Sequence, residues 1–378
     1  MKRLACIPLL IALFLSTACQ PVQPPAGAGA PLATTATSIT AVPARQIVTD
    51  VELIGEAVFA TDEQFAETEV GGLSGLVYDK ANDIYYALSD DRSQRNPARF
   101  YTLAIDLSDG TLDEGDVTFQ NVTTLRDEMD APYAENAVDP EGLALTRDGT
   151  LLVASEGNVD AKPMAPPFIR HYSETGEFAA DIPLPAYYYP NADRTSGVRN
   201  NLALENLAVS MDGGALWAAI EGALAQDGPI ADLETGSLVR VLQIDLESGQ
   251  PQHEYVYITD PIPQAPNPAD GTADNGLVDL LSLDASGTLL TLERAYAQGV
   301  GNSIRLFQAQ TSGALDVLGQ ASLFNADAGV PFEMDPPVAK TLLADLGELG
   351  ATLDNFEGMT FGPLLPDGRP LWWIGVPN

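Results

Sequence analysis

One outline occurs five times in this chain and limits what it can fold into. Each copy has a small or acidic residue, a short apolar run, a turn bearing Asp or Gly, and a second apolar run. Turns such as RDGT and MDGG are typical of β-hairpins. A hairpin repeated along a chain predicts an all-β fold built by radial repetition, a β-propeller. The copies are LSGLVYDKANDIYYALSDD (73–91), PEGLALTRDGTLLVASEG (140–157), LENLAVSMDGGALWAAIEG (204–222), VDLLSLDASGTLLTLERA (278–295) and FEGMTFGPLLPDGRPLWWIGV (356–376).

The spacing of the copies bears on the number of blades. They begin about 64 to 78 residues apart, which is longer than a usual blade of about 40 to 50 residues. We expect six blades, with five or seven as alternatives and a pair of β-sandwiches as the competing architecture. A short helical insertion is predicted near 336–349, because Val338, Leu342, Leu346 and Leu349 would lie close to one helical face.

The first 18 residues have the pattern of an export signal. Lys2 and Arg3 precede an apolar run, and small residues follow it. LSTAC resembles a lipobox that would make Cys19 the lipidated first residue, although Ser16 stands where that motif usually has Leu. Ordinary cleavage after Ala18 is the alternative. Residues 19–46 are rich in Pro, Ala and Thr and predict a flexible tether. Residues 47–378 would form the propeller domain.

The charge balance narrows the range of partners. The chain has 18 Lys and Arg against 53 Asp and Glu, a formal charge of −35. Such a surface repels nucleic acid and anionic lipid, so membrane contact is expected only through a lipid anchor. It also favours a monomer. The expected location is the bacterial cell envelope, in the periplasm or on the outer membrane face, with a secreted soluble protein as the alternative.

Acidic residues lie at both ends of several hairpins. The first residue of one strand and the last of the next share one end of a hairpin, so Glu141 should lie near Glu156, and Glu205 near Glu221. If these are the innermost strands of successive blades, their open ends meet at one mouth of the central channel. The sequence therefore predicts a ring of carboxylates made by Asp90, Asp91, Glu141, Glu156, Glu205, Glu221, Asp279, Glu293 and Glu357.

Such a ring needs positive charge or protons. Two carboxylates about 4 Å apart repel by roughly 4 kcal/mol at an effective dielectric near 20. Oxygen ligands without His or Cys suit Ca²⁺ best. Four arginines, Arg92, Arg294, Arg170 and Arg199, are placed nearby in sequence, and Arg92 and Arg294 are the candidates for contact with an anionic ligand. The alternative is that these acids are solvated turn residues or acceptors for backbone N–H groups.

At these residues the chain resembles a known family, the phytase-like family described by the esterase-like activity of phytase. The resemblance lies in GGLSGLVYD with YALSDDRS, DPEGLAL, NGLVDLLSLD with LLTLERAYAQG, and NFEGMTFGP with LPDG, from about Val51 onward. It implies a β-propeller related in outline to calcium-dependent propeller phytases, usually exported from bacteria.

The chain departs from that family's pattern at two places. Ala154-Ser155-Glu156-Gly157 stands where the family tends to have Ser-Asp-Glu-Gly, and WWIGVPN lacks the acidic pair that closes the family's last hairpin. The segment VTDVELIGEAVF (48–59) is expected to complete the last blade.

These observations give two functional hypotheses. The first is a calcium-dependent hydrolase of anionic phosphoric or carboxylic esters, in which Glu141, Glu205, Asp279, Arg92 and Arg294 do the chemistry. The second is a non-catalytic envelope propeller that binds a ligand or protein partner and holds structural calcium. A serine esterase is disfavoured, because no G-x-S-x-G motif and only two histidines occur.

Overall fold

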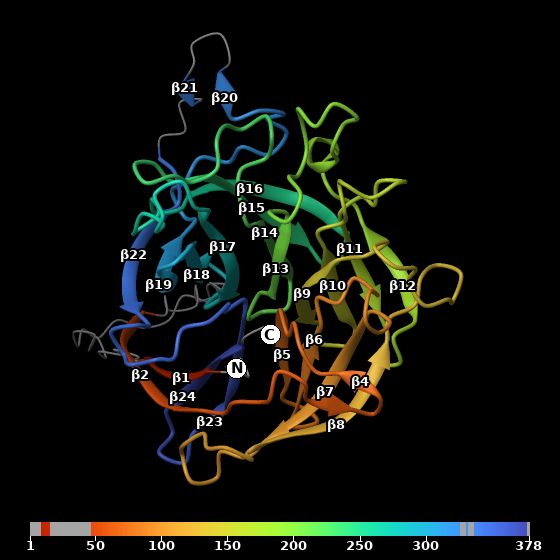
Figure 1. Ribbon diagram of the computed structural model, residues 1–378, viewed down its shortest axis with the longest axis vertical. Coiled ribbons are helices and arrows are strands. Elements are labelled where there is room, and N and C mark those ends of the chain that lie inside the picture. The colour runs from red at the N-terminus through yellow and green to blue at the C-terminus, as the bar shows by residue number, and fades with distance from the viewer. Residues whose placement is uncertain (1–8, 16–46, 326–329, 332–335, 376–378) are drawn as a thin grey trace, which may run out of the picture.

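Five four-stranded antiparallel sheets surround one axis (Figure 1). The computed structural model describes residues 9–15, 47–325, 330–331 and 336–375. Four of the sheets are built in chain order. The first contains β5 (Gly75–Asp79), β6 (Ile84–Leu88), β7 (Arg99–Ile105) and β8 (Val117–Thr124). The second contains β9 (Pro140–Leu145), β10 (Leu151–Ser155), β11 (Phe168–Tyr172) and β12 (Phe178–Ile182).

The chain then adds two more sheets in the same direction around the axis. The third contains β13 (Leu204–Val209), β14 (Ala215–Ile220), β15 (Leu238–Asp245) and β16 (Gln250–Ile258). The fourth contains β17 (Ala273–Ser282), β18 (Thr288–Ala297), β19 (Gly301–Gln310) and β22 (Ala339–Asp345). Small additions are β3 (Gln64–Phe65), β4 (Thr68–Glu69), β20 (Phe324–Asn325), β21 (Val330–Pro331) and a 3₁₀ turn at Ala186–Tyr188.

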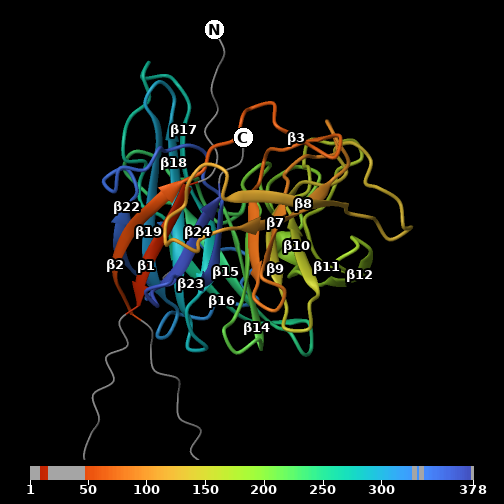
Figure 2. The same cartoon turned by 90° about the horizontal axis from the view of Figure 1, so that it is seen from below.

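The closing sheet joins both ends of the described chain. It has the order β2 (Val48–Glu56), β1 (Leu9–Leu15), β24 (Pro370–Gly375) and β23 (Gly358–Leu364), and Figure 2 shows these strands side by side. The predicted N-terminal strand at 48–59 thus belongs to the last sheet as β2, but β24 pairs with β1 rather than with β2. β1 is part of the apolar run of the predicted export signal. The rest of that signal, Cys19 and the tether lie outside the described residues.

The innermost strands form a closed ring. β5 contacts β9, β9 contacts β13, β13 contacts β17, β17 contacts β23, and β23 contacts β5. Apolar side chains fill the spaces between neighbouring sheets: Tyr86 and Phe100 of the first sheet pack with Leu151 and Val153 of the second. The propeller prediction is therefore confirmed, and the paired-sandwich alternative is excluded.

Two finer expectations were wrong. The favoured count of six blades does not match the five four-stranded sheets of the described residues, because long loops rather than extra strands take up the wide spacing of the repeats. The helix predicted near 336–349 is the strand β22, which pairs with the edge of β19. Leu342, assigned to the apolar helical face, is 51% exposed. In the part of the chain that the structure describes, no helix is both long enough and apolar enough to cross a membrane.

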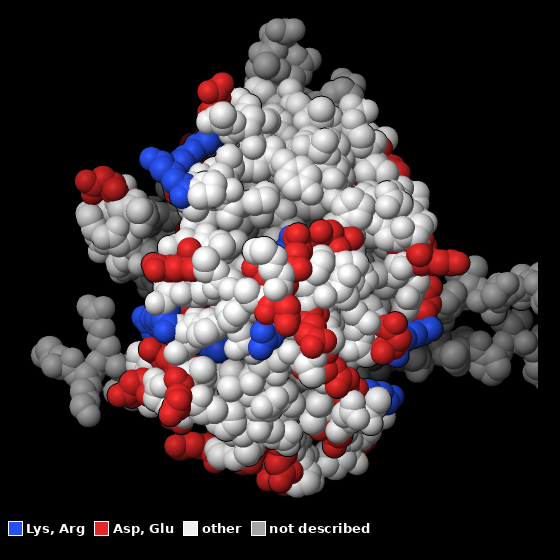
Figure 3. Space-filling view, turned by 90° about the vertical axis from the view of Figure 1, so that its right-hand side faces the viewer, with Lys and Arg blue, Asp and Glu red and all other residues white. Residues whose placement is uncertain are grey.

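Acidic side chains are scattered over the surface of the molecule. On the side of the molecule shown in Figure 3, Asp and Glu are spread widely among few Lys and Arg, as the composition leads one to expect.

Glycines let the inner strands approach each other closely. A Cβ on Gly142 would lie 2.9 Å from the carbonyl carbon of Asn206, and one on Gly358 would lie 2.7 Å from the backbone oxygen of Ser74. These glycines follow Glu141 and Glu357 in the repeat. The E-G pairs of the sequence thus combine an acid at the mouth with a close contact between strands.

Replacing Gly75 by Ala should destabilise the fold by about 1–3 kcal/mol, the usual cost of overpacking. The added Cβ would stand 2.7 Å from the backbone oxygen of Glu141 and 2.8 Å from the Cβ of Leu143. Chemical unfolding curves measure the loss. Gly214→Ala is the control, since its Cβ would have no neighbour nearer than 3.5 Å, and it should change stability by less than about 0.5 kcal/mol. Equal losses in both variants would contradict close strand approach as the cause.

Candidate metal centre

The strand register decides which side chains meet at the mouth. One apolar residue of each inner strand pairs with a residue of the second strand: Leu76–Ala87, Leu143–Val153, Leu207–Ala218, Leu280–Thr291 and Met359–Ile374. Two residues before the first member of each pair stand Ser74, Glu141, Glu205, Val278 and Glu357. Three residues after the second member stand Asp90, Glu156, Glu221 and Arg294 in the first four sheets.

The register thus brings six of the nine predicted metal ligands to the mouth, together with both predicted arginines. Two groups of three carboxylates each have ligand oxygens within 4.8 Å of one another, and all their members are buried. The groups share Glu156. They are Asp139, Glu141 and Glu156 in the first and Glu156, Glu205 and Glu221 in the second.

A cavity of about 340 Å³ lies beside these groups. Its walls include Asp90, Asp139, Glu141, Glu205 and Glu357. A small anion or ester could therefore reach the carboxylates from solvent.

Each of the two arginines binds its own acids. Arg92 donates from Nε to Asp139 Oδ1 at 2.7 Å and from Nη2 to Asp139 Oδ2 at 2.6 Å. Arg294 lies 3.0 Å from Glu221 Oε1 through Nη2 and contacts Glu357 through Nη1. Asp90, Glu141, Glu156 and Glu205 form no ion pair with either arginine among the described residues.

Glu156 is the carboxyl group of the ring that is best placed to bind a cation. Its Oε1 accepts a hydrogen bond from the backbone N–H of Ala203. Its Oε2 is buried and accepts no hydrogen bond from an N–H or hydroxyl group of the described structure, while the Glu205 carboxyl group lies within hydrogen-bonding reach of Glu156. A buried carboxylate oxygen without such a donor is costly, and this oxygen belongs to the residue that both carboxylate groups share. The donor set fits a hard cation with oxygen ligands.

Burial is also the main cause of raised pKa values in the ring. It raises the pKa of Glu156 to about 8, with the charge of Asp139 adding to the effect. The pKa of Glu221 rises to about 7 through burial, against the lowering effect of Arg294. Burial and neighbouring acids put the pKa values of Glu141 and Glu205 well above their usual range. The ring therefore retains protons near neutral pH, and a bound cation would displace them.

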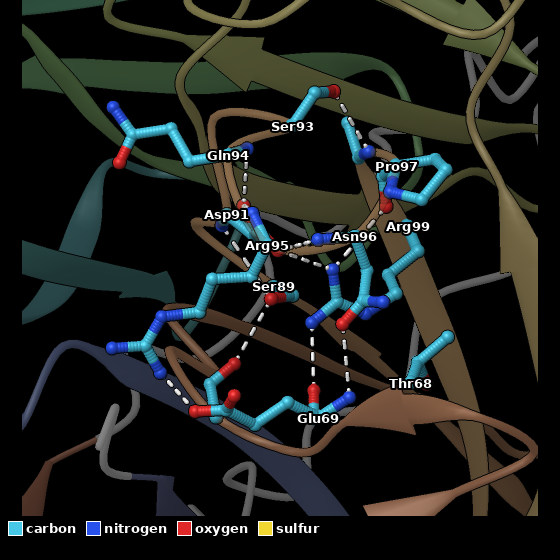
Figure 4. A network of polar contacts seen from close by, with 12 residues as sticks. Thr68, Glu69, Ser89, Asp91, Ser93, Gln94, Arg95, Asn96, Pro97 and Arg99 are labelled. Carbon is cyan, nitrogen blue, oxygen red and sulfur yellow. Dashed lines mark hydrogen bonds and ion pairs between the residues drawn. The ribbon is translucent and has the colours of Figure 1, made fainter.

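A loop between β6 and β7 builds one wall of the cavity (Figure 4). Asp91, predicted as a metal ligand, is used to hold this loop together. It accepts hydrogen bonds from the backbone N–H groups of Gln94, Arg95 and Asn96 and pairs with Arg99 at 2.8 Å. Hydrogen bonds to these groups lower the pKa of Asp91, although its burial opposes them. Its role is to shape the wall.

Two other predicted ligands lie outside the ring. Asp279 accepts hydrogen bonds from the backbone N–H groups of Leu280 and Met359 and so joins the fourth sheet to the closing sheet. Glu293 accepts from the Tyr257 hydroxyl at 2.7 Å and pairs with Lys340. Val278, directly before Asp279, and Arg294, directly after Glu293, stand at the positions where the other sheets place ring residues. A shift of one residue in a strand moves a side chain to the opposite face.

The two more distant arginines also lie elsewhere. Arg170 pairs with Glu128 and Asp181 on the second sheet, and Arg199 donates to the backbone oxygens of Ala223 and Gly228.

Sequence reasoning missed Asp139, Asn201 and Asn355. Asp139 stands two residues before Glu141 in the DPEG segment, and residues two apart in a strand share a face. That spacing could have identified it. Asn201 accepts from Arg92 at 2.6 Å and Asn355 contacts Arg294; both lie in loops, so no periodicity points to them.

The chain has similarities to known proteins. It is 26% identical over 187 residues to an uncharacterized secreted protein of Arthroderma benhamiae, a match over 42% of this chain and 34% of the relative. The chain thus spans about a third of that relative's length.

Solved structures also share features with the chain. The Bacteroides thetaiotaomicron endo-arabinase structure is 12% identical, with 82% of this chain and 90% of that chain covered and a TM-score of 0.43. The Pseudomonas aeruginosa periplasmic gluconolactonase is 12% identical, with 90% and 99% covered and a TM-score of 0.33. The Dos1 propeller is 9% identical, with 86% and 71% covered and a TM-score of 0.35. Similarity this distant says nothing of activity.

A family model described as esterase-like activity of phytase matches residues 68–375. That range contains all five hairpins of the repeat and every side chain of the acidic mouth. The chain belongs to the phytase-like family.

Proposed function

We propose that this protein is an exported hydrolase of anionic esters, with phosphoric esters favoured over carboxylic ones, and that it uses Ca²⁺ at the acidic mouth. The observation that carries the proposal is the pair of buried carboxylate groups that share Glu156. The nearby cavity supports access by a small ligand.

Calcium fits the donor set better than softer metals do. The ligands are carboxylates alone, and Ca²⁺ takes six to eight oxygens at about 2.3–2.6 Å. Two oxygens that bind one such ion can lie as far apart as about 5 Å, and the ligand oxygens of each group lie closer together than that. Asp139, Glu141, Glu156, Glu205 and Glu221 would hold the cation, and a bound Ca²⁺ would supply a Lewis acid for the ester oxygen.

The protein's own side chains would bind and orient the substrate. Glu141 and Glu205 belong to different carboxylate groups and both line the cavity, so they are the proposed acceptors of a proton from water. Arg92 lies on the same wall, and its positive charge would steady an anionic group. Asp279 has no part in this chemistry, because its carboxylate joins two sheets.

We further propose that the protein acts in the cell envelope as a monomer without nucleic acid partners. The predicted signal, the lipobox at Cys19 and the acidic composition support this location. Cleavage before Cys19 would remove β1 from the closing sheet. If anchored, the protein would contact the membrane only through the lipid.

A non-catalytic binding propeller with structural calcium is the second candidate. One observation favours it: the arginines at the mouth already serve acids of the protein. Arg92 donates to Asp139 from two nitrogens, and Arg294 contacts Glu221 and Glu357. Few cationic groups are left to stabilise a transition state.

Replacing Glu156 by Gln should greatly weaken calcium binding without unfolding the protein. The amide oxygen can still accept from Ala203, while the negative charge shared by both groups is lost. Isothermal titration calorimetry should show an affinity at least about tenfold lower, as expected when a charged ligand of a hard cation is removed. Glu177→Gln is the matched control, because Glu177 is exposed at the outer β11–β12 turn. Full calcium affinity in the Glu156 variant would contradict the proposed site.

The Tm measured in chelator and the increase in Tm caused by calcium should change in opposite directions with pH. Carboxyl groups with raised pKa values stabilise the fold below their unfolded pKa, and this contribution is lost as pH rises through the folded values. Those values are about 6 for Asp139, about 7 for Asp90 and Glu221 and about 8 for Glu156. The Tm in chelator should therefore fall between about pH 5 and pH 8.5, while stabilisation by calcium grows. A calcium effect of equal size at every pH would oppose this account.

Catalysis is tested by ester turnover of the protein with calcium. Phosphate release from phytate and from a simple phosphomonoester, together with cleavage of a carboxylic ester, forms the panel. Glu141→Gln and Glu205→Gln should each lower turnover by about 10²-fold or more, the usual contribution of a general base, while Glu177→Gln retains it. Calcium stabilisation without turnover on any substrate would support the binding propeller instead.

A further inference from the structure

We propose that Arg294 is a cation supplied by the chain itself, which fills a position in the ring that a metal ion would otherwise occupy. The inference rests on the proposed function and concerns the number of metal ions that the ring of carboxylates binds. It assigns Arg294 a positioning role in place of the predicted contact with substrate.

The strand register makes Arg294 equivalent to three acids. It stands three residues after Thr291, which pairs with Leu280. The corresponding residues in the first three sheets are Asp90, Glu156 and Glu221. A positive side chain therefore stands in the fourth sheet where the other three sheets place a negative one.

The contacts of Arg294 are those expected of a bound cation. Its side chain is buried and joins acids from two different sheets, Glu221 at 3.0 Å and Glu357. Asn355 supplies a neutral oxygen. Burial alone would lower the pKa of Arg294, but the charges of Glu357, Glu221 and Glu205 raise it. The guanidinium is thus fixed in its charged form.

One N–H donor of Arg294 is left unused. Nε of Arg294 is buried and has no hydrogen-bond partner in the described structure, although the whole residue is only 9% exposed. The ion pairs of Arg294 are therefore made by its two terminal nitrogens alone.

The charge balance shows what Arg294 does to the ring. Seven carboxyl groups of the ring lie near two guanidinium groups: Asp90, Asp139, Glu141, Glu156, Glu205, Glu221 and Glu357 with Arg92 and Arg294. The charge of Asp274 also acts on Glu221 and Arg294. Arg294 neutralises the part that contains Glu221 and Glu357. Metal binding is then confined to the part around Glu156, where Glu141 and Glu205 have no ion pair among the described residues.

The test counts the calcium ions bound by the full protein. Equilibrium dialysis followed by elemental analysis should give about one more Ca²⁺ per chain for Arg294→Gln than for the unchanged protein, because vacated carboxylates recruit a hard cation. Arg294→Lys retains the charge and should leave the count unchanged. Arg305→Gln is the control for charge, since Arg305 pairs with Asp260 and Asp345 away from the ring, and should also leave it unchanged.

The outcomes separate this inference from the proposed function. An unchanged count in Arg294→Gln, with calcium bound by the parent protein, would overturn the role of Arg294 alone. No calcium in the parent but one ion in the variant would support that role and refute the proposed calcium site. If the variant stays unfolded in millimolar calcium while Arg294→Lys folds, the inference fails, because a metal ion should replace the missing charge.

Discussion

The structure depends on how closely its five inner strands approach one another around the axis. Gly75, Gly142 and Gly358 remove the side chains that would hold neighbouring strands apart. The same strands carry acids at one end, so a narrow ring forces carboxylates together. Two of them about 4 Å apart repel by roughly 4 kcal/mol at an effective dielectric near 20. The carboxyl groups of the narrow ring must therefore bind protons or cations, and this requirement governs the chemistry of the mouth.

The positive charge comes from a different source on each side of the mouth. Arg294 neutralises Glu221 and Glu357 with a covalently attached charge, which needs no ion from solution. Around Glu156, Arg92 pairs with Asp139 alone, and Glu141, Glu156 and Glu205 form no ion pair with either arginine among the described residues. A fixed cation gives stability that does not vary with the medium, whereas an exchangeable one makes stability and ligand binding respond to calcium. The contrast between the two sides, rather than acidity alone, makes this a candidate metal centre.

The repeat in the sequence was sufficient to predict the propeller and the gathering of acids at one mouth, because hairpin ends coincide in space. It was not sufficient to place Asp279 and Glu293, since an alignment by eye cannot detect a shift of one residue. Asp139 was detectable from its spacing to Glu141. The strand β22 was mistaken for a helix because four apolar residues satisfied a helical period, while the unpaired edge of β19 decided the outcome. Contacts from loops, such as that of Asn355, follow no periodic pattern.

The position of the two carboxylate groups along the chain bears on the order of folding. All their members lie between Asp139 and Glu221, a segment that contains the second sheet and the first hairpin of the third. Glu357 belongs to the closing sheet, which brings together strands from both ends of the chain. Pairing segments so far apart in sequence is slow, because a large loop must close first. A cation could therefore be captured by the second and third sheets while the ring is still open, and would serve as a nucleus against which the remaining sheets assemble.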